Sequence, residues 1–148
     1  MVEIHTPTFR RLVRVDFNIV STKLFLKALV SAPAARDMSE IVRDLGREAG
    51  LLLAQARALS EPKITLPSPT EFAVRLVSPV AAQAINALQL CDDANRHLVR
   101  AEFDGHVTHD KRLAMVKPAI LAWWELKRFA LDIELKSSAE LANEMAIM

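Results

Sequence analysis

Glycine, the residue that most often weakens a helix, occurs at only three of the 148 positions, and tyrosine is absent. Alanine, leucine and valine are abundant, and alanine and leucine lose little freedom when a helix forms. Apolar residues make up 51% of the chain and charged residues 25%, a balance typical of a folded protein rather than a disordered one. A chain of this length forms one hydrophobic core. We therefore expect a single, mainly α-helical domain over residues 1–148.

Two stretches depart from the helical pattern. From Arg11 to Val20, apolar and polar residues alternate, and a second alternation covers residues 72–76. Period-two alternation of β-branched and aromatic residues is typical of half-buried strands. Isolated strands leave backbone groups without partners, so these two must pair, within one chain or between two. The sequence thus predicts a mainly α fold with a two-stranded antiparallel β-ribbon, ribbon-helix-helix-like and in the order β-α-α-β-α-α.

Capping residues place the helices of this scheme. A first helix follows Ser21 or Thr22 and is ended by Pro33, and a second covers 38–59 after a capping box. Ser78 followed by proline begins a third helix, and Thr108 begins a fourth, in which we expect a kink or restart at Pro118. The expected order is a loose arm at 1–8, strand–helix–helix at 9–59, a proline-rich linker at 60–69, a second strand–helix–helix at 70–135 and a short C-terminal helix at 137–148.

A two-stranded ribbon fits the major groove of DNA, where side chains of its outer face read bases. The net charge of +1 makes no case for nucleic acid, but basic residues gather between residues 9 and 27. Asp16 opposes this assignment because its carboxylate repels phosphates, and a polar strand face is also an ordinary solvated surface. The predicted DNA-binding residues are Arg10, Arg11, Arg14, Asn18, Lys23, Lys27 and Arg75.

Other candidate sites are weaker. His97, His106 and His109 lack the spacing and the cysteine company of zinc sites, so we expect no metal. The single cysteine, Cys91, excludes an intrachain disulfide and is expected to be a buried helical residue. The pair Trp123-Trp124 indicates core packing or an interface. The chain has no phosphate-binding glycine loop and no catalytic motif, so we expect no cofactor, no small-molecule ligand and no enzymatic activity.

The stretch from Leu66 to Trp124 resembles the AcaB-type proteins of conjugative plasmids and integrative conjugative elements. The resemblance lies in a proline-flanked strand, Ser78-Pro79-Val80, an aspartate near the helix middle, the Gly105 turn and tryptophan in the last helix. It implies a transcriptional regulator of conjugative-transfer genes, with an activator favoured over a repressor, that contacts DNA in the ribbon–helix–helix manner.

The expected partners are double-stranded DNA and a second copy of the chain, because ribbon proteins ordinarily work as homodimers on palindromic sites. No apolar run reaches membrane-spanning length and no leader pattern is visible, so we expect a cytoplasmic protein. The main alternative is a non-enzymatic helical scaffold or interaction protein of a conjugation system, which would use the apolar Trp123–Phe129 region rather than basic strand residues. A toxin–antitoxin or repressor module is a third hypothesis.

Overall fold

The computed structural model describes residues 2–59, 70–74 and 78–132. It confirms a mainly helical protein with one two-stranded antiparallel sheet, but the order β-α-α-α-β-α-α replaces the predicted repeat of strand–helix–helix, and the arrangement is not a clear ribbon–helix–helix fold. Its elements are β1 (Val2–Ile4), α1 (Pro7–Leu12), the π-helical segment η1 (Val13–Phe17), α2 (Asn18–Val30), α3 (Ala32–Leu59), β2 (Thr70–Phe72), α4 (Pro79–Phe103) and α5 (His109–Leu131).

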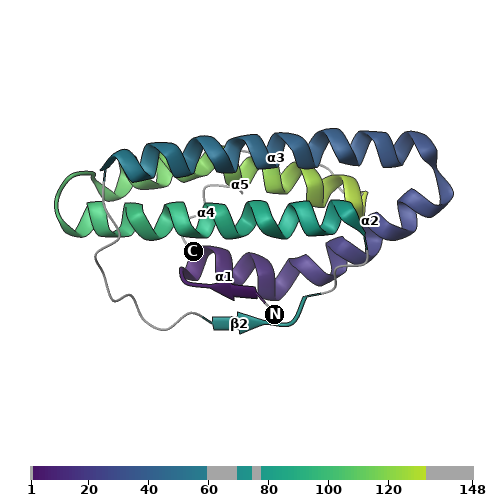
Figure 1. Ribbon diagram of the computed structural model, residues 1–148, viewed down its shortest axis with the longest axis horizontal. Helices are drawn as coiled ribbons and strands as arrows, with labels where there is room; N and C mark the ends of the chain where they lie inside the picture. The colour runs from purple at the N-terminus through teal and green to yellow at the C-terminus, as the bar shows by residue number, and fades with distance from the viewer. Residues whose placement is uncertain (1, 60–69, 75–77, 133–148) are drawn as a thin grey trace.

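The helices form an elongated bundle (Figure 1). α1, η1 and α2 follow one another as one continuous helical rod, and this rod runs opposite to α3 along the bundle. α4 runs in the same direction as α3, and α5 returns beside them (Figure 1). α3 ends at one end of the bundle and α4 begins at the other (Figure 1), and β2 lies between them in the chain.

The N-terminal rod overturns the predicted strand at residues 11–20. The residues that are buried are Phe9, Leu12, Val13, Phe17 and Val20, whose spacing of three, one, four and three residues is helical. The alternating apolar positions are Val13, Val15, Phe17 and Ile19. Only Val13 and Phe17 reach the core, because Val15 and Ile19 are exposed. Over ten residues the alternation therefore indicated a strand wrongly. The longer stretch from Phe9 onward shows the helical spacing of buried residues.

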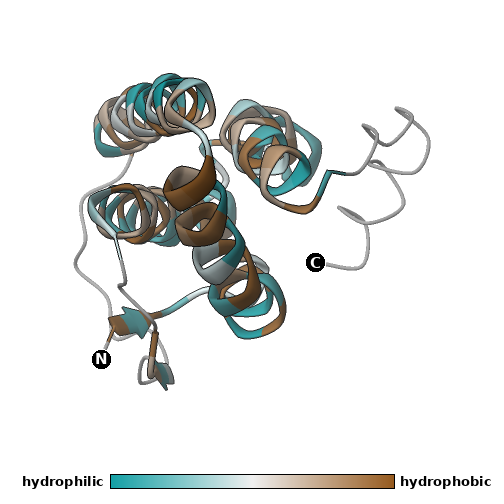
Figure 2. Cartoon of the chain, turned by 90° about the vertical axis from the view of Figure 1, so that its right-hand side faces the viewer, coloured by the Kyte–Doolittle hydropathy of each residue, from teal (hydrophilic) through white to brown (hydrophobic). Residues whose placement is uncertain are grey.

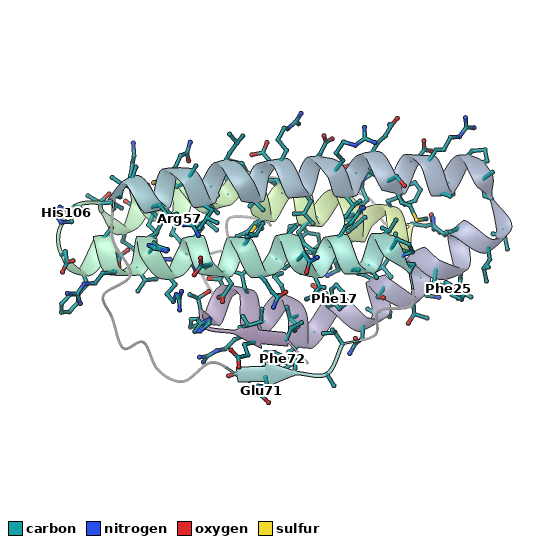
Figure 3. The ribbon with its side chains drawn as sticks, in the orientation of Figure 1. Phe17, Phe25, Arg57, Glu71, Phe72 and His106 are labelled. Atoms are coloured by element: carbon teal, nitrogen blue, oxygen red, sulfur yellow. The ribbon has the colours of Figure 1, made fainter. Side chains whose placement is uncertain are left out.

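The ribbon uses the segment that was expected to be a loose arm. β1 pairs with β2 so that Val2 faces Phe72, Glu3 faces Glu71 and Ile4 faces Thr70. Val2 and Ile4 are buried against the bundle, while both glutamates are exposed. In Figure 3, Glu71 lies on the side of β2 that is turned away from the helices. The outer face of the ribbon is thus acidic, in contrast to the basic face that the sequence suggested.

Three of the four helix starts can be compared with the capping predictions. Ser78 and Thr108 cap α4 and α5, since their hydroxyls accept hydrogen bonds from the backbone N–H groups of Ala81 and Lys111, at 3.2 and 3.1 Å. α3 begins six residues earlier than predicted, at Ala32 rather than residue 38, and Pro33 lies in its first turn, where proline is tolerated. Of the two alternatives at Pro118, the restart is wrong, because α5 is one helix through that residue, and the kink stays a prediction.

A single hydrophobic core joins the ribbon to all the helices. Trp123, Leu126 and Cys91 are completely buried within it, which confirms the packing role predicted for the tryptophan pair and for the cysteine. No helix in the described part of the chain has both the length and the apolarity needed to cross a membrane. The predicted linker at 60–69, the C-terminal helix at 137–148 and Arg75 lie outside the described residues.

Candidate interaction surface

A buried carboxylate fixes the start of the N-terminal rod. Asp92, in the middle of α4, is 1% exposed. One of its oxygens accepts hydrogen bonds from the backbone N–H and the hydroxyl of Thr6, both at 2.8 Å. The other accepts from the backbone N–H of His5 at 2.8 Å and lies 3.1 Å from Nδ1 of the same histidine. Thr6 is the N-cap residue of α1 and makes no side-chain cap of its own. Asp92 instead accepts from the N–H groups of Thr6 and of the residue before it, and so holds the start of the helix from α4.

The rod is held along its length by α5. The rings of Phe17 and Trp123 stack with centroids 6.3 Å apart and an interplanar angle of 18°. Beside them, the ammonium group of Lys127 lies 3.0 Å from the carboxylate of Asp16, and both side chains are mostly buried. The same ammonium lies 4.3 Å from the centroid of the Trp124 ring. Asp16 therefore forms an ion pair with Lys127 at the edge of the core, and its carboxylate does not point outward toward a nucleic acid.

The opposite side of the rod is apolar and uncovered by any described residue. We call this surface the α2 face; its residues occur at intervals of four, seven, three and one, so they follow one side of a helix. Their exposed fractions are 60% for Val15, 50% for Ile19, 49% for Leu26, 66% for Leu29 and 85% for Val30. Figure 2 looks onto the end of the bundle where α2 meets α3 and shows the brown, apolar residues that dominate α2 there.

α2 is thus apolar on its inner side, through Val20 and Leu24, and also on its outer side. A helix that is apolar all round is normally buried on all sides. Large apolar side chains scattered singly over a surface need no explanation, but a continuous row on one helix marks an interaction site. The α2 face is therefore the candidate functional surface of the described chain.

The predicted DNA-binding residues do not converge on a ribbon. Arg14 and Lys23 are exposed on the rod and Arg11 is half-buried. Nε of Arg10 donates to the backbone oxygen of Ile4 at 3.4 Å, and the side-chain amide of Asn18 donates to the backbone oxygen of Ala73 at 3.3 Å. Lys27 pairs with the carboxylate of Asp132 and lies 4.8 Å from the centroid of the Phe129 ring. The placement of Arg14 and Asn18 on a strand is wrong, because both lie in the helical rod, while the role of the seven residues in DNA binding stays a prediction.

The histidine-rich turn forms an ion-pair network. Glu102 accepts a hydrogen bond at 3.0 Å from Arg112 and lies 3.0 Å from His109, while Arg112 also donates to the side chain of Asn95 at 3.0 Å. Burial raises the pKa of Glu102, but the hydrogen bonds and charges of Arg112 and His109 outweigh it and hold that pKa below its usual value of 4.5. No group of three potential metal-ligating side chains occurs among the described residues.

Cys91 is a packing residue. Burial, reinforced by the neighbouring charge of Asp92, raises the pKa of its thiol to about 12. Since the thiolate is the reactive form, this sulfur is inert in the folded protein.

A shallow groove of about 560 Å³ lies between α3 and α4. Gly46 lines this groove, and Gly50 lies one turn further along α3. In the described chain no atom lies within 4 Å of the position that a Cβ would take on either glycine. Arg43 is the only charged residue of the groove, so it offers no set of groups for acid–base chemistry. The lining residues are Ser39, Val42, Arg43, Gly46, Gln83, Asn86, Ala87 and Leu90.

The role of Asp92 was not recognised from the sequence. Asp92 and Asp93 are adjacent, and adjacent helical residues point in different directions, so their carboxylates are not expected to act as a pair. The structure agrees, since Asp93 pairs with Arg96 and Asp92 faces the N-terminus. One signal was visible: Asp92 shares the α4 face of Leu88 and Asn95, which is otherwise buried. A carboxylate at such a position needs hydrogen-bond donors, although the sequence does not say which.

No family model, no curated protein and no solved structure matches this chain. The resemblance to AcaB-type proteins therefore remains a prediction from short motifs.

Proposed function

We propose that this protein is a non-enzymatic helical interaction protein that binds a protein partner through the α2 face. The observation that carries the proposal is the row of exposed aliphatic side chains from Val15 to Val30 on a helix that is also apolar underneath. A partner helix that lays its own apolar side along this row would bury both surfaces, as in other helix-in-groove complexes. Arg14 and Lys23, exposed on the same rod, would contribute charge selectivity toward an acidic partner.

The DNA-binding regulator of conjugative-transfer genes is the second candidate. It is weakened by the outer face of the ribbon, because Glu3 and Glu71 lie opposite each other there and would repel phosphates. The observation that still supports DNA binding is the exposure of Arg14 and Lys23. Through these residues the rod itself, rather than a ribbon, would contact the DNA backbone. Homodimer formation is compatible with either function and stays a prediction.

One experiment distinguishes the two candidate functions, because it compares a substitution on the apolar α2 face with substitutions of basic residues on the same rod. A photo-cross-linking amino acid is placed at Ile19 in one protein and at Arg47 of α3, as a matched exposed position, in another. A partner captured from cells at Ile19 but not at Arg47 is identified, purified and titrated with the protein in solution. We expect Ile19→Asp to weaken that binding at least tenfold, since central apolar contacts dominate interface energy, and Arg14→Ala/Lys23→Ala to weaken it less.

The DNA arm uses the same purified proteins and a random duplex pool over a salt series. Sequence-selective binding with a steep salt slope that is lost in Arg14→Ala/Lys23→Ala, but kept in Ile19→Asp, would favour the regulator and reject the interaction protein. Ile19 is half exposed, so its substitution should leave the fold intact. The circular dichroism melting curve checks this.

A further inference from the structure

The groove between α3 and α4 has the size of a small-molecule site. Its volume of about 560 Å³ lies within the range of about 300–1,000 Å³ that such sites occupy. One wall comes from α3, where Ser39, Arg43 and Gly46 follow one side of the helix. The other wall comes from α4 and includes Gln83 and Leu90. Gly46 keeps the middle of the groove open, because no described atom lies within 4 Å of the position that its Cβ would take.

The bottom of the groove is apolar. Val42 and Ala87 line it and belong to the buried core, whereas the side chain of Leu90 is 40% exposed. A ligand with an aliphatic body would cover this leucine and rest against the two core residues. Removal of apolar surface from water would favour that contact. The groove therefore suits a molecule with an apolar part better than a small polar ion.

The polar groups of the groove favour an anion. Arg43 is the only charged residue among those that line it, and no described residue forms a hydrogen bond or an ion pair with its guanidinium. Arg47, one turn further along α3, differs because it pairs with Asp44. On the α4 wall, the exposed amides of Gln83 and Asn86 have no hydrogen-bond partner in the described chain either. A guanidinium binds a carboxylate through two parallel hydrogen bonds, and each side-chain amide can add a donor.

We propose that the groove binds a small organic carboxylate with an aliphatic body. The carboxylate pairs with Arg43, and the aliphatic body lies over Val42, Ala87 and Leu90. From the sequence we expected no small-molecule ligand, because the two walls belong to different helices and no single motif contains them. The site lies on α3 and α4 rather than on the N-terminal rod, so it does not depend on the protein partner proposed for the α2 face.

The test titrates octanoate into the full-length, 15N-labelled protein and follows the backbone amide signals. We expect saturable shifts centred on residues 39–46 and 83–90. Acetate has the charge without the aliphatic body, and octylammonium has the body with the opposite charge, so neither should cause saturable shifts there. Equal responses to octanoate and to either control compound would overturn the proposal. The absence of saturable octanoate shifts, or saturable shifts on the α2 face alone, would also overturn it.

Two pairs of variants test the position of the ligand. Arg43→Glu should weaken octanoate binding at least about tenfold, because it replaces an attraction with a repulsion. Arg47→Glu changes the net charge equally but lies outside the lining, so binding should stay within about twofold of wild type. Gly46→Leu should fill the groove and abolish binding, whereas Gly50→Leu, outside the lining, should preserve it.

These variants are expected to keep the fold. Arg43 and Arg47 are exposed, and no described atom lies within 4 Å of the Cβ position of either glycine. Leucine also favours a helix more than glycine does, and the amide spectra verify the fold of each variant. Equal octanoate affinities within either pair would refute the assigned site, and that result would leave the function proposed for the α2 face untouched.

Discussion

Replacement of Asp92 should detach the N-terminal arm and lower the free energy of unfolding. Its carboxylate receives two backbone N–H groups and a hydroxyl at 2.8 Å from a site that is 1% exposed. A hydrogen bond to a charged group contributes about 1.5–3 kcal/mol, and a buried donor left unpaired costs about 1–3 kcal/mol. The hydroxyl of Thr6 can rotate to another acceptor and the N–H of His5 is only partly buried, so the contributions do not simply add.

We therefore expect Asp92→Ala to lower the free energy of unfolding by about 3–5 kcal/mol. Asp92→Asn keeps the volume and one acceptor oxygen but turns an NH2 group toward backbone donors, so a loss of about 2 kcal/mol is expected. The matched control is Asp93→Asn. That carboxylate is partly exposed and pairs with Arg96 one turn away on the same helix, and such a pair contributes about 0–1 kcal/mol.

Urea unfolding followed by circular dichroism gives the three free energies, and hydrogen exchange of residues 2–12 gives the local effect. Exchange should accelerate in β1 and the first turn of α1 for both Asp92 variants and stay unchanged for Asp93→Asn. Equal losses for Asp92→Asn and Asp93→Asn, or unchanged exchange in the arm, would refute the view that Asp92 anchors the N-terminus.

Four further predictions follow from the same structure. Gly46→Ala and Gly50→Ala should each raise the free energy of unfolding by about 0.5–1 kcal/mol in urea titrations, because a methyl group meets no atom within 4 Å at either site and alanine favours the helix. Asp16→Asn should lower it by about 1–2 kcal/mol, because the ammonium of Lys127 loses a largely buried partner; an unchanged urea midpoint would contradict this. Glu102 has a pKa below 4.5 in the folded protein, so its stabilising contribution is complete above that pH and is lost as the pH falls through the folded value; the urea midpoints of wild type and Glu102→Gln should therefore differ near neutral pH and converge in acid. The thiol of Cys91, whose pKa burial raises to about 12, should react with a chromogenic disulfide only after unfolding in urea, and rapid reaction of the folded protein at pH 8 would show that the site opens.

The acidic ribbon shows why the strand pairing could not be predicted from the sequence. Pairing in a sheet joins residues far apart in sequence, and nothing in residues 2–4 marks them as the partner of 70–72. The strand expected at 11–20 failed for a different reason: over ten residues, alternation and helical spacing share several positions, and only burial of Phe9 and Leu24 on the same side decides between them. Arg14 and Asn18 were therefore assigned to the wrong kind of element.

The sequence by itself determined the features that depend on near neighbours. The helical class, the starts of α4 and α5 at Ser78 and Thr108, and the burial of Cys91 and Trp123 all follow from propensity, local capping and periodicity. Only the tertiary structure decided which donors the carboxylate of Asp92 meets, which strand pairs with β2, and which side of α2 stays uncovered. These outcomes depend on contacts between segments up to 105 residues apart, and local sequence patterns carry no information about which distant groups a folded chain brings together.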